Sequence, residues 1–421
     1  MKSNAISHYA PCGTNKRLRI FLQLFYAMFI CWAVSVAFCE TQQHVFFAAG
    51  KDLFADFFNN VRYVAGRDPY FDTTIASSEH IYPPICYLLF YPFACLYKWY
   101  GAIILPSAEM RAFWSDKVAM ISCSLFMLLS AIPLLWAVWR IVRKYSSLAT
   151  RILLVASFLL SGIMMFSFER GNLILLASSA LAMFMVCTEN GRGWQWLSLA
   201  ISVKIYPAMF ISLLIQQRKY RQIALVVVCT MALGFLPLFF FKHGVLENSL
   251  QLMQNVKDQG AVYYNSCPPN LSVAAYVAGA SRVLNLEWLV FVAKLLRYGA
   301  FVLGVFSFIG ACVINEKWKC WFLAAASAIL CSNFAGYYTL LYFIPAIYSY
   351  LSSDTHWVGV DWLYTIACVI WLTPFQVGLL PVIKDSVNPF ISGCMIAIVA
   401  TAILAEAGVK RWAKSEHLAY L

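Results

Sequence analysis

The chain has 421 residues, of which 62% are hydrophobic and 12% are charged, and its mean hydropathy is +0.71. This composition exceeds what a soluble core requires, so it predicts an integral membrane protein with repeated spans. The formal net charge of +12 does not indicate nucleic acid binding, because the basic residues form short clusters between apolar runs, as the positive-inside bias predicts. The 14 cysteines and 6 histidines show no metal-ligand spacing, so we expect no metal site and no cofactor.

The first apolar run, residues 18–39, is long enough to span, because about 20 apolar residues cross a hydrocarbon layer of about 30 Å. A predicted outward loop, residues 40–116, follows it. Five apolar side chains of this loop recur at helical spacing and share one face: Phe54, Phe57, Phe58, Val61 and Val64. They predict an amphipathic helix that is too polar to span and that ends before Gly66 and Pro69.

Further apolar runs follow along the chain. The long ones are 117–139, 152–168, 221–241, 288–314, 361–381 and 390–408, and the shorter ones are 171–188, 318–332 and 336–351. Residues 81–101 are expected to be interfacial or re-entrant, since a span there would put one basic cluster on the wrong side of the membrane. The spanning alternative stays open, because the positive-inside rule is a bias.

Residues 194–217 are apolar at both ends but interrupted at Lys204 and Pro207, and basic residues flank both ends. A single membrane crossing would put one of these basic flanks on the non-cytoplasmic side. We therefore expect two half-length helices, 194–203 and 207–217, each about 15 Å long. The total becomes about 12 membrane helices with both termini cytoplasmic. They form a single all-α, polytopic domain over residues 1–421.

The predicted outward segments are 40–116, the turn at 169–172, the apex at 204–207, and the loops 242–287, 333–336 and 382–389. In the loop 242–287, Asn265, the Pro268-Pro269 pair and the Asn270-Leu271-Ser272 sequon are expected to line an acceptor entrance. The polar candidates on this side are Asp56, Arg170, Asn172, Lys204, Tyr206, Tyr337 and Tyr338. One carboxylate with two separated cations suits deprotonation of a hydroxyl and neutralisation of a phosphate leaving group.

Each candidate has a structural alternative. Asp56 could be a helix-terminal acid, and Arg170 could pair with Glu169 at a turn. Asp68 and Asp72 are better explained as turn residues beside a proline. The tyrosines could be packing or interfacial aromatics, whereas a lysine in the middle of an apolar stretch is costly unless it is functional.

Several segments resemble membrane glycosyltransferases of the GT-C superfold: DLFADFFNNVRYVAGRDPYFD, the YPP that follows it, ERGN, VKIYP before RKYR, and YYTLLYFIPA. The chain is most similar to the family of polyprenol-phosphate-mannose-dependent α-mannosyltransferases, glycosyltransferase family 87. The similarity covers most of the length in the same order. Two departures stand out: Gly171-Asn172 replaces a Gly-Gln-x-Asn arrangement, and Tyr337 and Tyr338 stand where relatives often carry histidine.

The resemblance implies that Asp56 is the general base and that Lys204 and Arg170 hold the donor phosphate. It further implies substrate-binding roles for Tyr82, Tyr206, Asn172, Tyr337 and Tyr338. The implied reaction transfers a sugar, mannose first, from a polyprenyl-phosphate donor to a glycan or glycolipid hydroxyl, inverting and without metal. It takes place on the outer side of a cell membrane, most readily a bacterial inner membrane.

Two other functions remain open from the sequence. A transporter or flippase of lipid-linked glycans also needs intramembrane charges and broken helices, although the chain holds no second copy of its DFF…DPY or KIYP patterns. A glycan ligase or polymerase would use a lipid-diphosphate donor.

Overall fold

A computed structural model describes residues 16–38, 53–71, 80–100, 109–143, 147–188, 190–265, 270–332, 335–353, 357–374 and 388–419. Regular structure in these ranges is helical, apart from one isolated β-bridge between Asn270 and Gly336. The predicted all-α class is therefore confirmed. Asp72, the Pro268-Pro269 pair and most of the predicted 382–389 loop lie outside the described residues.

Five helical segments are long and apolar enough to cross a membrane: α1 (Lys16–Phe38), α6 (Lys117–Val142), α12 with η2 (Tyr220–Phe240), α15 (Trp288–Val313) and residues Asn388–Lys410 of α19 (Asn388–Ala419). A sixth arises if α7 (Leu148–Leu159) and α8 (Gly162–Arg170), bent by 46°, form one span. By length and composition the described chain thus holds five or six candidate spans. The count of 12 is not reached and stays a prediction.

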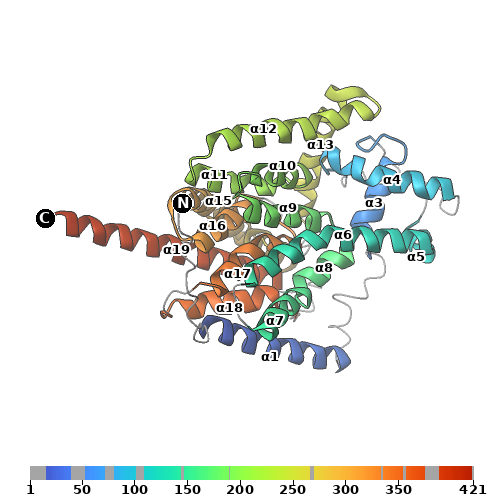
Figure 1. The fold of residues 1–421 in the computed structure, drawn as a ribbon. Coiled ribbons are helices and arrows are strands. Elements are labelled where there is room, and N and C mark those ends of the chain that lie inside the picture. Colours follow the sequence, from blue (N-terminus) through green and yellow to red (C-terminus); the bar gives the residue numbers. More distant parts are fainter. Residues whose placement is uncertain are drawn as a thin grey trace, which may run out of the picture.

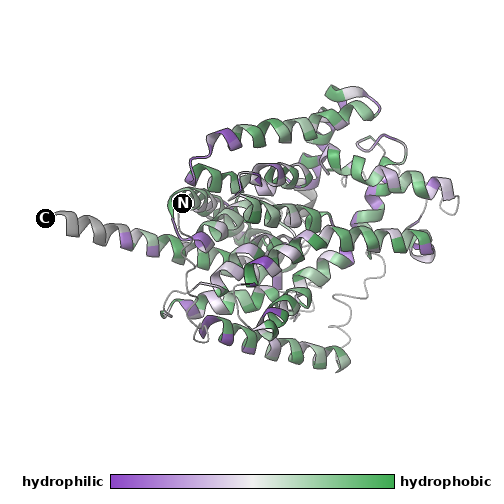
Figure 2. Ribbon diagram, in the orientation of Figure 1, coloured by the Kyte–Doolittle hydropathy of each residue, from purple (hydrophilic) through white to green (hydrophobic). Residues whose placement is uncertain are grey.

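The shorter apolar runs form short helices, of which the most buried make the interior of the bundle. They are α9 (Ile174–Cys187), α16 (Lys317–Leu330), η3 (Tyr337–Phe343) and α17 (Ile344–Leu351). The first part of the predicted long run 361–381 also forms a short buried helix, α18 (Asp361–Leu372). Most side chains of α9 and α16 are buried, whereas the candidate spans α1 and α15 have only 17% and 11% of their apolar windows buried. Hydropathy alone does not separate a core helix from a lipid-facing one, because both are apolar all round. In Figure 2, α12 is hydrophobic along most of its length.

A helical hairpin occupies the interrupted stretch 194–217. It consists of α10 (Gly193–Val203), η1 (Tyr206–Phe210) and α11 (Ile211–Gln216). Lys204 has an extended backbone between them. Beyond α11, the Lys219 ammonium donates to the carbonyl of Thr188, which directly follows α9, at 2.9 Å. The start of α10 and the end of α11 therefore lie at the same end of the bundle, next to Thr188. The predicted break at Lys204 is confirmed.

The predicted amphipathic helix is α3 (Ala55–Val64). Four residues of its expected apolar face, Phe57, Phe58, Val61 and Val64, are buried, whereas Phe54 precedes the helix and is partly buried. Phe57 packs its ring against Phe90 and Phe93 of α4 (Pro84–Tyr100), with centroids 5.3 and 5.1 Å apart. In Figure 1, α3, α4 and α5 (Met110–Ser115) gather at one end of the bundle, opposite the C-terminal end of α19. This end holds the candidate site.

Two further features of the bundle are the helices of the 242–287 segment and an ion pair at the start of α1. The described part of the predicted 242–287 loop is mostly helical, as α13 (Gly244–Asn265) and α14 (Val273–Val283). Near the start of α1, the Arg17 guanidinium donates to both carboxylate oxygens of Asp361 in α18, each at 2.8 Å. Both side chains are buried, so this pair fixes α1 against the bundle.

Candidate active site

The turn between α8 and α9 sets the geometry of the site. Gly171 ends α8 in the left-handed conformation, with φ +64°, and the Asn172 N–H donates to the Ser167 carbonyl at 3.3 Å. This is a Schellman-type helix end, which favours glycine because an L side chain is strained at positive φ. Arg170 and Asn172 therefore lie on either side of a fixed turn.

The start of α3 docks directly onto this turn. The Phe54 N–H donates to the Glu169 carbonyl at 2.6 Å. A Cβ on Gly171 would lie 3.0 Å from the Phe57 Cβ and 3.1 Å from the Phe54 Cα, so the two backbones approach as closely as glycine permits. Asp56, in the first turn of α3, is thereby brought against Arg170.

The Asp56 carboxylate receives one donor at each oxygen. Arg170 Nη2 donates to Oδ1 at 2.8 Å, and Asn172 Nδ2 donates to Oδ2 at 2.6 Å. Asn172 Nδ2 also lies 3.1 Å from the Tyr82 hydroxyl oxygen, which accepts. The Asp56 side chain remains 18% exposed, so a substrate hydroxyl can reach it. These two hydrogen bonds fix the direction of the carboxylate.

Lys204 lies beside the same tyrosine. Its ammonium is 4.2 Å from the centroid of the Tyr82 ring and 5.8 Å from that of Tyr338. Among the residues that the structure describes, Lys204 has no carboxylate or hydrogen-bond acceptor as a partner. Burial lowers the pKa of Lys204 from its ordinary value, and the negative charge of Asp56 opposes that shift. An anion bound here would favour the charged form.

The late turn, residues 335–338 at the start of η3, contributes Tyr338 to the site but not Tyr337. Tyr338 stacks on Phe166 of α8, with centroids 5.9 Å apart and an interplanar angle of 17°. Tyr337 is buried, and its hydroxyl has no partner among the described residues. The turn is held by the Leu271 N–H, which donates to the Ala335 carbonyl at 2.8 Å. The buried Asn270 of the sequon is thus a structural part of this turn.

The structure therefore brings together six of the predicted residues: Asp56, Arg170, Asn172, Tyr82, Lys204 and Tyr338. Tyr206 lies two residues beyond Lys204, and its hydroxyl is hydrogen-bonded to Ser332. Phe166 was not predicted, since one aromatic in an apolar run gives no signal. The Arg170 guanidinium reaches Asp56, a contact that the structural alternative of a turn pair did not include.

Asp68 belongs to a separate contact. Its Oδ2 lies 3.2 Å from His243 Nε2 in a partly exposed pair that joins the segment after α3 to the residue before α13. This agrees with its interpretation as a structural residue. No group of three or more His, Cys, Asp or Glu side chains capable of holding a metal occurs in the described ranges.

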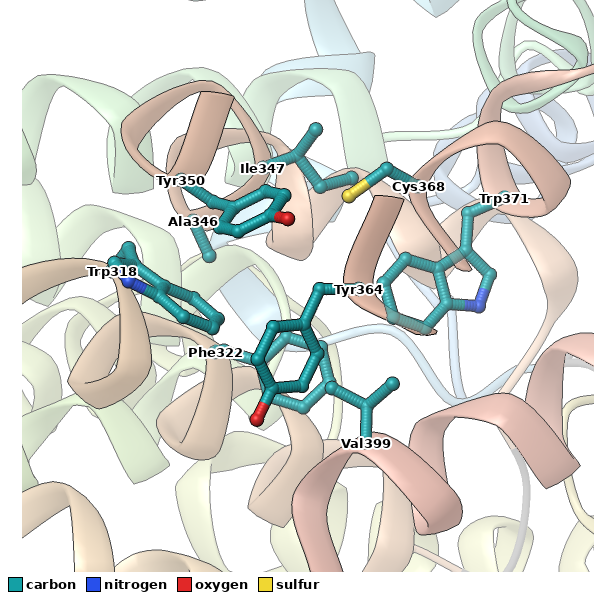
Figure 3. Close-up of a pocket in the computed structure, with 9 residues that line it drawn as sticks. All are labelled: Trp318, Phe322, Ala346, Ile347, Tyr350, Tyr364, Cys368, Trp371 and Val399. Carbon is teal, nitrogen blue, oxygen red and sulfur yellow. The ribbon is translucent and has the colours of Figure 1, made fainter. Parts of the chain in front are cut away.

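The pocket in Figure 3 is a separate feature of the bundle interior. It lies between α16, α17, α18 and α19 and is lined by Trp318, Phe322, Ala346, Ile347, Tyr350, Tyr364, Cys368, Trp371 and Val399. Its space fits no more than about one water molecule. None of the candidate site residues lines it, so we regard it as a gap in aromatic packing.

Comparison with known families identifies the chain. The sequence profile of glycosyltransferase family 87 matches residues 80–342, which is more than half of the chain and includes Tyr82, the 169–172 turn, Lys204 and the late turn. Asp56 lies before the matched range. No curated protein matches the chain. The match to the family profile, together with the membrane helices, shows that this chain is a membrane protein that belongs to glycosyltransferase family 87.

Proposed function

We propose that this glycosyltransferase takes its sugar, mannose as the first choice, from a polyprenyl-phosphate donor. The acceptor is a hydroxyl of a glycan or glycolipid. The observation that carries this proposal is that a carboxylate, Asp56, lies near an ammonium, Lys204, which forms no ion pair with a protein carboxylate among the described residues. The first suits a proton acceptor and the second suits a phosphate.

The reaction would run as a single displacement. The acceptor oxygen attacks the anomeric carbon, its proton passes to Asp56, and the bond between that carbon and the phosphate oxygen breaks. The departing lipid phosphate carries the electron pair and is neutralised by Lys204. Attack opposite the leaving group inverts the anomeric configuration. No metal is required by this scheme, because the leaving group is a monophosphate.

Arg170 takes a different place in this proposal from the one that the resemblance implies. Its Nη2 donates to Asp56, so we propose that it positions the base, and that Lys204 is the main cation for the phosphate. Asn172 shares the positioning role through the second carboxylate oxygen. Tyr82 and Tyr338 flank the Lys204 ammonium with their ring faces.

The basic residues support a site on the outer side of the membrane. The open end of the hairpin, where Lys219 contacts Thr188, carries the basic residues Arg192, Arg218, Lys219 and Arg221. Lys204 lies at the apex, about 16 Å along α10 from that end at 1.5 Å per residue. The positive-inside bias puts the basic end in the cytoplasm, and hence the apex and Asp56 toward the other side.

The test is transfer by the purified, lipid-reconstituted protein from a panel of radiolabelled polyprenyl-phosphate sugars to a glycolipid extract. We expect product with a monophosphate donor. Product only with polyprenyl-diphosphate donors would establish the ligase or polymerase alternative. Movement of a lipid-linked glycan across vesicles without any transfer would establish a flippase.

A further inference from the structure

The orientation of the Asn172 amide is fixed by the helix that follows it. The backbone N–H of Ile174, the first residue of α9, donates to Asn172 Oδ1 at 2.8 Å. An amide NH₂ cannot accept from an N–H, so the oxygen must face α9 and the nitrogen must face Asp56 and Tyr82. Asn172 is 1% exposed and its two N–H groups have two acceptors. It therefore has no donor left for a substrate.

This orientation also fixes the direction of the Tyr82 proton. The Tyr82 oxygen accepts from Asn172, so its own O–H must point elsewhere. No acceptor for that proton occurs among the residues that the structure describes. Burial raises the pKa of Tyr82 well above its ordinary value, so the phenol stays protonated. Tyr82 is only partly buried, so its hydroxyl is left as a donor beside Asn172 and Asp56.

The surroundings of this hydroxyl indicate which group it meets. The Lys204 ammonium lies over the face of the Tyr82 ring. A phenolic O–H lies in the plane of the ring, so the O–H of Tyr82 does not point at a phosphate bound to Lys204. A donor to the attacking oxygen would weaken the nucleophile. Between the base and the phosphate lies the sugar itself. We propose that the Tyr82 hydroxyl donates to a hydroxyl oxygen of the transferred sugar and helps to select that sugar, an inference that rests on the proposed function.

The test combines Tyr82→Phe with donors that lack single hydroxyls. The donors are polyprenyl-phosphate mannose and its monodeoxy analogues, and the readout is kcat/KM for transfer. Tyr82→Phe should lose about tenfold with the complete donor, the value of one neutral hydrogen bond. With one analogue, the parent and Tyr82→Phe should agree within about twofold, because the partner hydroxyl is already missing. A loss that is equal across all donors, or no loss at all, overturns the proposal.

Asn172→Asp provides a second, independent variant. One carboxylate oxygen still accepts the Ile174 N–H, but the other now accepts the Tyr82 proton and turns it away from the sugar. Its charge beside Asp56 lowers transfer from every donor, and the loss should be about tenfold smaller with the same analogue that Tyr82→Phe singles out. An equal loss across the series counts against the assignment.

The matched control is Tyr97→Phe. Tyr97 lies in the neighbouring α4, and its hydroxyl is bonded to Ser122 at 2.6 Å. Tyr97→Phe should change kcat/KM by the same factor for all donors. A factor that depends on the donor would show that the pattern is not specific to Tyr82. A parent protein that transfers from no polyprenyl phosphate refutes the proposed function and this inference together. An active parent with a uniform Tyr82→Phe loss refutes only the Tyr82 contact.

Discussion

Replacing Asp56 by asparagine tests the base most directly. The carboxylate accepts from Arg170 at one oxygen and from Asn172 at the other, at 2.8 and 2.6 Å. Asparagine offers one oxygen and one NH₂, so Asp56→Asn keeps one of these bonds and sets two donors against each other at the second. It also cannot take the proton of the acceptor hydroxyl.

The expected loss follows from that chemistry. A positioned general base contributes about 10² to 10⁴-fold, so turnover should fall by at least about two orders of magnitude, or about 2.7 kcal/mol in the barrier. Donor affinity should change little, because Lys204 and its aromatic neighbours are untouched. The variant therefore separates kcat from binding.

The assay is product formation from a radiolabelled polyprenyl-phosphate sugar, with donor affinity and thermal unfolding measured on the same preparation. Asp68→Asn is the matched control, because Asp68 is a partly exposed partner of His243 and a surface pair contributes little. It should stay within about twofold of the parent. Near-normal turnover by a folded Asp56→Asn, or an equal loss in Asp68→Asn, would refute Asp56 as the base.

Three further predictions concern the cation, the turn and metal. Lys204→Ala should weaken transition-state stabilisation by about 2–4 kcal/mol while the protein stays folded, and a fully active variant removes Lys204 from the site. Gly171→Ala should lower transfer by pushing α3 away from α8. Gly191→Ala is the control, because Gly191 also has a positive φ but has open space where a Cβ would lie, and it should leave transfer unchanged. Equal activity in the two variants contradicts the close approach of α3 to Gly171. Transfer should survive exhaustive chelation, and a loss that Mg²⁺ or Mn²⁺ restores would contradict a lysine-neutralised phosphate.

Local features of this chain were predictable from its sequence. The face of α3 was predictable because period-3.6 spacing of Phe57, Phe58 and Val61 reports burial directly. The break at Lys204 was predictable because charge at both flanks conflicts with a single crossing. Each of these predictions depends on residues close together along the chain.

Long-range features were not predictable from a single sequence without the family resemblance. Asp56 and Arg170 are 114 residues apart, and no local pattern brings them together. Their contact depends on the close approach of α3 to Gly171, which becomes visible only in three dimensions. Five or six candidate spans are long and apolar enough by themselves, and the predicted count of 12 is not confirmed, because hydropathy does not separate buried short helices such as α9 and α16 from lipid-facing ones.

The different partners of Asp56 and Lys204 would let the proposed base and the proposed phosphate cation act side by side. A direct Lys204–Asp56 ion pair would neutralise both groups, and a phosphate would then have to displace the carboxylate. Asp56 is instead held by Arg170 and Asn172, while Lys204 rests on the faces of Tyr82 and Tyr338. A cation–π contact contributes about 0.5–2 kcal/mol, less than a charge-assisted bond to phosphate typically offers in a desolvated site. The aromatic faces can therefore hold the ammonium in place and still allow it to bind the phosphate of the donor.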